Sequence, residues 1–96
     1  MERKITLEGI EYTLRTRTVG EGKILRNRLA IDGYKTQEGV GLGEFQVLSV
    51  FTALKSWSRS EPLTQENFEN LTPEPHIDRL FEIAQDVNTL PLSEKN

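Results

Sequence analysis

The hydrophobic positions between Phe45 and Trp57 form the longest apolar pattern in the chain, and they recur at helical spacing. At about 100° per residue, the large apolar side chains fall within an arc of about 120° on one side of a helix. These side chains are Val47, Val50, Phe51, Leu54 and Trp57. Leu48 widens the arc on one side, and the opposite side is polar. The pattern predicts a core helix over about residues 44–57, around which the other elements pack.

The N-terminal residues show a different period, in which apolar and polar side chains alternate in steps of two. The alternation breaks at Glu8-Gly9, and a glycine adopts the positive φ of a tight turn at no steric cost. We therefore predict a β-hairpin over about residues 4–16. Because a lone hairpin is only marginally stable in water, we expect its apolar face to pack on the core helix.

Residues 18–33 have apolar positions that fit either a strand or a helix. Thr18 and Glu21 have the spacing of a capping box, and Gly33 stands where a helix that ends in a left-handed residue would stop. These signals favour a helix over about residues 20–32, although Gly20 and Gly22 each cost it about 1 kcal/mol relative to alanine. The glycine-rich residues 34–43 predict a loop, which lacks the lysine and the Ser/Thr of a phosphate-binding loop.

Two more helices are predicted in the C-terminal part, and each has a start signal. Thr64 is a natural N-cap, and Leu63 can pack on Phe68, which predicts a short helix over 65–71. Thr72 and Pro73 repeat the device and predict a helix over about 73–89. The apolar residues of this last helix recur at helical spacing: Ile77, Leu80, Phe81, Ala84 and Val87. Residues 92–96 form a polar tail.

These elements predict a single small α+β domain, with an N-terminal β-hairpin packed on three to four α-helices. Ninety-six residues suffice for one hydrophobic core but not for two. The chain has no cysteine, which excludes disulfides and thiolate metal sites and suits a reducing compartment. No apolar run approaches the roughly 18 residues of a membrane span, and the charged start is not followed by the apolar stretch of a secretory signal. We expect a soluble, cytoplasmic protein.

The charge is distributed unevenly along the chain. Residues 1–35 contain eight Lys/Arg and five Asp/Glu, whereas residues 36–96 contain four and ten. Such a distribution can favour head-to-tail self-association or a partner of mixed charge, and it can equally reflect two solvated faces.

The sequence shows no candidate catalytic centre. His76 is the only histidine, and no nucleophile or carboxylate stands at a spacing that would make it a base or a metal ligand. We therefore expect it at the surface or in a hydrophobic staple. Carboxylate pairs such as Glu66 and Glu69 lie on polar helix faces, where solvation and the helix dipole explain them. These observations predict a protein that is not an enzyme and needs no cofactor or metal.

A nucleic-acid-binding role would need clustered basic residues. The candidates are Arg15, Arg17, Lys23, Arg26 and Arg28. Acidic residues interrupt this cluster, few aromatic residues accompany it, and the chain as a whole has a net charge of −3. The sequence thus argues against nucleic-acid binding, and a small nucleic-acid-binding regulator is kept as an alternative.

Residues 53–88 read ALKSWSRSEPLTQENFENLTPEPHIDRLFEIAQDVN, and this segment resembles the small tail assembly chaperones of long-tailed bacteriophages. In that family an apolar helix runs into a Lys/Glu-Ser-Trp segment, a proline leads a Leu-Thr-x-Glu-Asn start, and a final amphipathic helix ends near an asparagine. The matching positions here are Lys55, Ser56, Trp57, Pro62, Leu63, Thr64, Glu66, Asn67, Leu71 and Asn88. The resemblance implies a non-enzymatic chaperone that binds the tape-measure protein in the host bacterial cytoplasm during tail morphogenesis. A structural head-tail or tail-completion component of the virion is the alternative of another class.

A chaperone for an apolar helical client needs apolar surface, which self-association often protects when the client is absent. The wide apolar arc of the core helix suggests such a surface, because it is wider than one hairpin and one helix need to cover. The candidate partner-binding residues are Val47, Leu48, Phe51 and Trp57. Trp57 either closes the core or is a partly exposed aromatic anchor for the partner.

Overall fold

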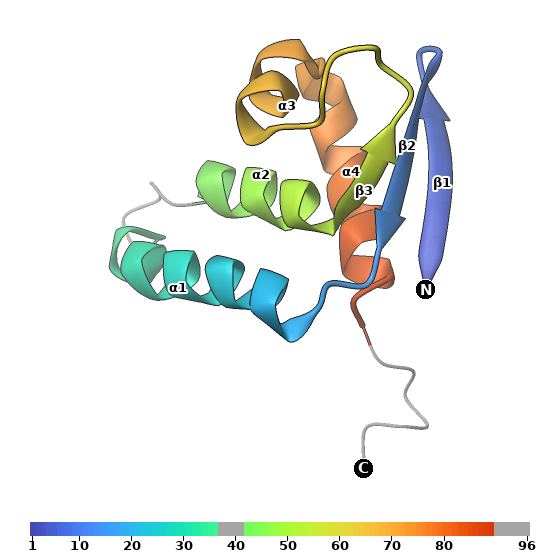
Figure 1. Ribbon diagram of the computed structural model, residues 1–96. Coiled ribbons are helices and arrows are strands. Elements are labelled where there is room, and N and C mark those ends of the chain that lie inside the picture. The colour runs from blue at the N-terminus through green and yellow to red at the C-terminus, as the bar shows by residue number, and fades with distance from the viewer. Residues whose placement is uncertain (37–41, 90–96) are drawn as a thin grey trace.

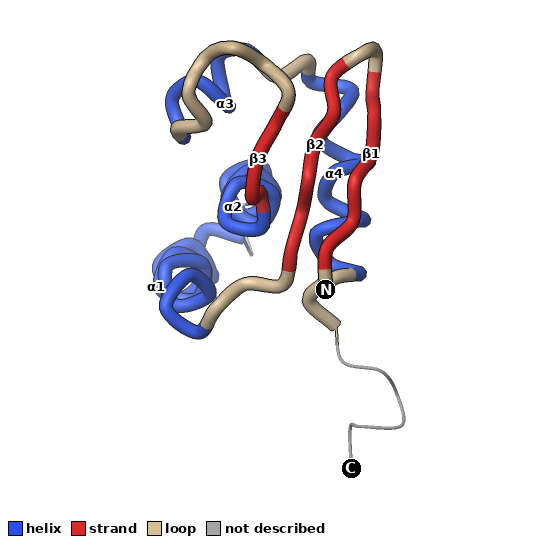
Figure 2. Tube along the Cα trace, turned by 45° about the vertical axis from the view of Figure 1, so that its right-hand side comes forward, coloured by secondary structure: helices blue, strands red, loops and turns tan. Residues whose placement is uncertain are grey.

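The computed structural model describes residues 1–36 and 42–89, which form one small α+β domain (Figure 1). Its elements are β1 (Glu2–Leu7), β2 (Ile10–Arg15), α1 (Val19–Thr36), α2 (Leu42–Ala53), β3 (Leu54–Trp57), α3 (Gln65–Leu71) and α4 (Glu74–Asp86). The strands form an antiparallel sheet of order β1-β2-β3. Helix α2 packs against α4 and against β2, while α1 and α3 both pack on α2 (Figure 2). The predicted fold class is confirmed, and the sheet has a third strand in addition.

The predicted hairpin is confirmed, and β1 begins slightly earlier than expected. Strands β1 and β2 pair from Glu2 opposite Arg15 to Leu7 opposite Ile10. Glu8 and Gly9 connect them with φ of 50° and 82°. Positive φ at both central residues is what the twist of a two-residue hairpin turn of type I′ requires.

The core helix predicted over 44–57 is wrong at its C-terminal end. Helix α2 stops at Ala53, and the chain continues directly into β3, which pairs with β2. The register places Leu54 opposite Leu14 and Trp57 opposite Tyr12, with an irregularity between them. The extra residue of such a bulge leaves two side chains three positions apart on the same face of the sheet. Their spacing therefore matches that of a helix, although the segment is a strand.

Helix α1 is longer than the predicted helix over 20–32, because it continues through Gly33 to Thr36. The predicted start is confirmed: the Thr18 N–H donates to Glu21 Oε1 at 2.8 Å, and the Glu21 N–H donates to Thr18 Oγ1 at 3.2 Å. The loop predicted over 34–43 is too long, since residues 34–36 and 42–43 are helical. Its remaining residues, 37–41, lie outside the described part of the chain.

Helix α3 has the predicted bounds, and its predicted cap is confirmed, because Thr64 Oγ1 accepts a hydrogen bond from the Asn67 N–H at 3.1 Å. Helix α4 is shorter than the predicted 73–89. Thr72 does not cap it; Thr72 instead ends α3, where its N–H donates to the Phe68 carbonyl at 3.1 Å. Pro73 occupies the N-cap position of α4. The same sequence pattern predicts the N-termini of α3 and α4. Thr64 is available to cap α3, whereas Thr72 already serves as the C-cap of α3. The polar tail 92–96 lies outside the described residues.

The hydrophobic core lies between the sheet, α2 and α4, and α3 closes one end of it. Its buried members are Tyr12, Leu14, Val50, Ala53, Leu54, Phe68, Leu80, Ile83, Ala84 and Val87. The apolar face predicted for the last helix is confirmed, since its residues are buried or pack against this cluster. The opposite face of this helix is exposed at Asp78, Glu82, Gln85 and Asp86.

We expect Leu80→Ala to lower the free energy of unfolding by about 2–5 kcal/mol, because Leu80 is fully buried and a cavity would remain. Urea unfolding followed by circular dichroism measures the loss. The matched control on the same helix is Gln85→Ala, which removes an exposed side chain and should change stability by less than about 0.5 kcal/mol. Equal effects of the two substitutions would contradict this description of the core.

Candidate functional site

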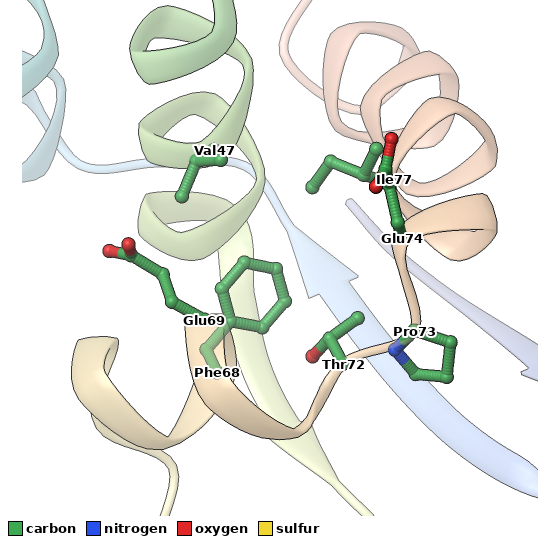
Figure 3. A pocket seen from close by; sticks show the side chains of 7 residues that line it. All are labelled: Val47, Phe68, Glu69, Thr72, Pro73, Glu74 and Ile77. Atoms are coloured by element: carbon green, nitrogen blue, oxygen red, sulfur yellow. The ribbon is translucent and has the colours of Figure 1, made fainter.

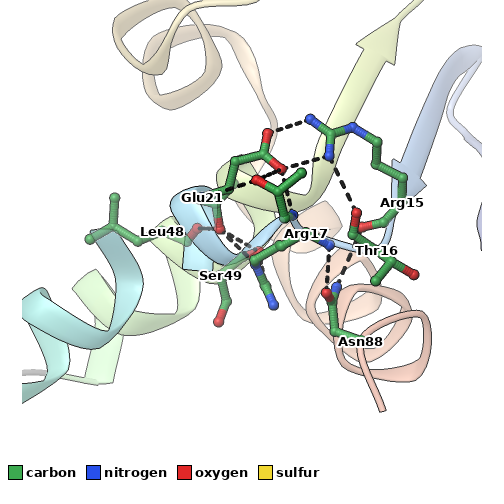
Figure 4. Close-up of polar contacts among 9 residues, drawn as sticks. Arg15, Thr16, Arg17, Glu21, Leu48, Ser49 and Asn88 are labelled. Atoms are coloured by element: carbon green, nitrogen blue, oxygen red, sulfur yellow. Dashed lines mark hydrogen bonds and ion pairs between the residues drawn. The ribbon is translucent and has the colours of Figure 1, made fainter. Parts of the chain in front are cut away.

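The four predicted partner-binding residues do not form one exposed apolar strip. Leu48 is only 6% exposed, and it lies on the part of α2 that faces α1 (Figure 4). Val47, Phe51 and Trp57 are half-buried and pack against the core. The expected strip is narrower because α1 covers one flank of α2 and α3 covers another. The large apolar side chains that are most exposed in the described residues lie elsewhere, at Met1, Val19 and Ile24.

Trp57 packs against the core and remains partly exposed. Its indole Nε1–H donates to the Glu61 carbonyl at 2.8 Å, and its ring lies 6.5 Å from that of Phe68. The guanidinium of Arg59 lies over the indole, 5.9 Å from the ring centre. The polar end and one face of Trp57 are therefore engaged within the chain itself.

One predicted partner-binding residue, Val47, borders a pocket of about 270 Å³ at the junction of α2, α3 and α4 (Figure 3). The other lining residues are Phe68, Glu69, Thr72, Pro73, Glu74 and Ile77. Val47, Phe68 and Ile77 provide apolar surface, while Glu69 and Glu74 bring carboxylates. The volume lies below the range of about 300–1,000 Å³ that is typical of pockets for drug-sized ligands and cofactors. The space is large enough to hold one apolar side chain.

The sequence did not reveal this pocket. Phe68 and Ile77 were predicted as packing residues from their spacing, and they do pack in the core cluster. Phe68 and Ile77 also line the pocket, because α3 and α4 separate at Thr72 and Pro73 and the space between the two helices borders α2 (Figure 3). The periodicity of a sequence shows which face of each helix is apolar. It does not show that the apolar faces of α2, α3 and α4 leave a space between them.

Two of the five basic residues that suggested nucleic-acid binding are engaged inside the fold. Arg15 forms a two-pronged ion pair with Glu21 (Figure 4). This hydrogen bonding by Arg15, together with the Thr18 backbone, lowers the pKa of the Glu21 carboxyl to about 2. Lys23 and Arg26 are exposed on α1. The side chain of Arg28 lies outside the described residues.

Arg17 joins three elements at the base of α1. Its Nε donates to Thr52 Oγ1 at 2.8 Å, and its Nη2 donates to the Ser49 carbonyl on α2 at 2.5 Å. Its backbone N–H donates to Asn88 Oδ1 at 2.8 Å, just beyond α4 (Figure 4). Burial lowers the pKa of Arg17 from its ordinary value. Arg17 therefore orients the α1–α2 pair, and its donors on Nε and Nη2 are engaged with α2.

His76 is buried, at 4% exposure, so the prediction of a surface or staple position is wrong. Its Nδ1 lies 2.9 Å from the Tyr12 hydroxyl, and its Nε2 lies 2.8 Å from Glu8 Oε1. Burial raises the pKa of Tyr12. The three groups come from β2, the hairpin turn and α4, so no local spacing could have indicated them. Because the three groups come from separate elements, the cluster fastens the hairpin to α4.

Within residues 1–36 and 42–89, no group of three or more His, Asp or Glu side chains is placed to hold a metal ion. None of the helices in this part of the chain combines the length and hydrophobicity that crossing a membrane requires.

Comparisons of the chain with family models, with curated proteins and with solved structures found no match.

The depressed pKa of Glu21 predicts how pH affects the start of α1. A carboxylate whose folded pKa is lowered stabilises the fold above its unfolded pKa, and this stabilisation is lost as the pH falls through the folded value. Here the window runs from about 4.3, the ordinary value, down to about 2. A carboxyl NMR titration should show the Glu21 inflection near 2 in the wild type. It should show a higher inflection in Arg15→Gln, and equal values in both proteins would contradict the role of Arg15.

The His76 cluster predicts unequal effects of its two partners on stability. Tyr12→Phe keeps the ring and leaves a buried His76 nitrogen without its partner, which should cost about 1–3 kcal/mol. Glu8→Gln changes a side chain that is 73% exposed, where a polar contact contributes about 0–1 kcal/mol. Urea unfolding at neutral pH compares the two variants. A larger loss in Glu8→Gln than in Tyr12→Phe would contradict the assignment.

Proposed function

We propose that this protein is a non-enzymatic tail assembly chaperone, which binds the tape-measure protein in the host bacterial cytoplasm while the phage tail forms. The observation that carries the proposal is the pocket at the junction of α2, α3 and α4. It offers an apolar recess for a client side chain. The resemblance of residues 53–88 to this family supports the same role.

The residues that carry the resemblance do not line the pocket, but several of them hold the loop and the start of α3, the helix that supplies Phe68 and Glu69 to the pocket. Thr64 caps α3, and the Asn67 side chain donates to the Pro62 carbonyl at 2.9 Å, so the loop before α3 is held in place. The Trp57 indole fixes the same loop through Glu61. Helix α3 is thereby positioned with Phe68 against α2 and against the gap to α4. In this proposal the shared pattern preserves the placement of a client-binding helix.

An apolar pocket in a free chaperone would bind client segments that aggregate on their own. Burial of apolar surface stabilises such a complex by about 25 cal/mol for each Å² removed from water. One large side chain in the pocket would act as an anchor, and a long helical client would supply several such side chains in succession. We therefore expect a low affinity for any single client side chain and a higher overall affinity for the whole client, which offers several such side chains.

The proposal expects a tape-measure gene beside the gene for this chain, and co-expression of the two proteins tests it. We expect the client to be soluble and to co-purify with the wild-type chain. We expect Val47→Gln, which keeps a helix-forming residue of similar size, to reduce the soluble client by at least half because it makes the pocket polar. The matched control is Gln85→Ala, on the exposed face of α4.

Circular dichroism of each variant shows that folding is retained before the comparison is made. Two results would contradict the proposal: a client that stays insoluble with the wild-type chain, or a folded Val47→Gln chain that works as well as the wild type. Mass spectrometry of purified virions separates the alternative role, because a structural component remains in the particle and a chaperone leaves it.

A further inference from the structure

We infer that the pocket between α2, α3 and α4 takes an apolar side chain from a helical segment that carries Lys or Arg one turn away on either side. This inference rests on the proposed client-binding function and specifies the chemistry of the client segment. The inference is drawn from the two carboxylates at the pocket, Glu69 and Glu74, because the apolar lining alone would not select the charge of the client segment.

The apolar part of the pocket is large enough for one side chain of a partner but not for a whole helix. Phe68 is 1% exposed and forms the base, while Val47 and Ile77 are half-buried and face each other across the opening (Figure 3). The space of about 270 Å³ accepts one large aliphatic or aromatic group. The rest of a partner helix must then lie across the rim, in contact with the residues that surround the opening.

The charged residues that line the pocket are both acidic. Glu69 lies on α3 and Glu74 in the first turn of α4, and the two side chains stand on opposite sides of Phe68 (Figure 3). Glu69 accepts a hydrogen bond from the Gln65 amide at 3.0 Å, which leaves its charge uncompensated by a cation. Among the described residues, neither carboxylate has an ion pair with a Lys or Arg, and no Lys or Arg lines the pocket.

The two carboxylates determine which residues should flank the apolar side chain in the client segment. A helix that lies over the rim displaces water from the two carboxylates, and an acidic or purely apolar helix gives no compensation for that loss. On a helix, residues three or four positions apart lie about 5–6 Å from each other on one face. Lys or Arg at i−4 and i+4 therefore flanks an anchor at i on both sides, as Glu69 and Glu74 flank the pocket.

Rim charges of this kind are partly exposed, so their effect is modest and depends on salt. Two complementary pairs should make a Lys-flanked segment about tenfold tighter than a Glu-flanked one at about 50 mM salt, and the difference should largely disappear at about 1 M. The apolar anchor supplies the remaining affinity, which should persist at high salt.

The test uses the full chain and two fluorescein-labelled helical peptides, which share a central Leu and differ in having Lys or Glu at i−4 and i+4. Fluorescence polarisation should show the Lys peptide binding about tenfold more tightly to the wild type. The double variant Glu69→Lys/Glu74→Lys should reverse the order, and Glu69→Gln/Glu74→Gln should abolish the preference if the reversed variant does not fold. The matched control, Glu66→Lys/Glu82→Lys, makes the same charge change on the same helices away from the pocket.

Several results would overturn the inference. The peptides could bind equally well, or the control variant could lose the preference as fully as the pocket variant. Sedimentation velocity could also show that the wild type self-associates and that Glu69→Gln/Glu74→Gln prevents it, which would make a second copy of the chain the occupant. If neither peptide binds but the wild type still keeps the tape-measure protein soluble, the charge inference fails and the proposed function stands.

Discussion

The fold depends on β2 being buried in the middle of the sheet. Tyr12 and Leu14 have no exposed surface, and Thr13 between them is 5% exposed. A strand enclosed in this way must have both of its edges paired, because a buried backbone group without a partner costs as much as a lost hydrogen bond. The hairpin satisfies one edge, and β3 satisfies the other. The sharp change from α2 to β3 follows from this requirement.

The same strand positions the helices around the pocket. Its end leads to Arg17, which holds α2, and its middle carries the Tyr12 hydroxyl, which reaches His76 in the first turns of α4. Strand β3 pairs with β2, continues directly from α2 and leads into the loop before α3, so α2 and α3 are both joined to β2 through β3. Helix α4 is joined to β2 by the hydrogen bond between His76 and Tyr12. The pocket is therefore built on the same core that surrounds β2, because Phe68 belongs to that core and Val47 and Ile77 pack against it.

The elements that could be predicted from the sequence are those whose signals are local. The hairpin turn, the Thr18 capping box and the Thr64 cap each involve residues within four positions, and all three are present. Strand β3 was missed because the bulge at Lys55 gives Leu54 and Trp57 the spacing of a helix. The His76 contacts and the pocket were missed because they join distant segments, and only one of the four predicted partner-binding residues, Val47, lines the pocket.

The hairpin turn shows how a distant contact can govern a local choice of residue. Glu8 has a φ of 50°, and it is the only non-glycine residue in the described part of the chain with a positive φ. Asparagine or glycine would adopt this conformation more readily. Neither has a side chain long enough to replace the Glu8 carboxylate beside His76. Relaxing the turn with either residue would thus remove the contact that joins the tip of the hairpin to α4.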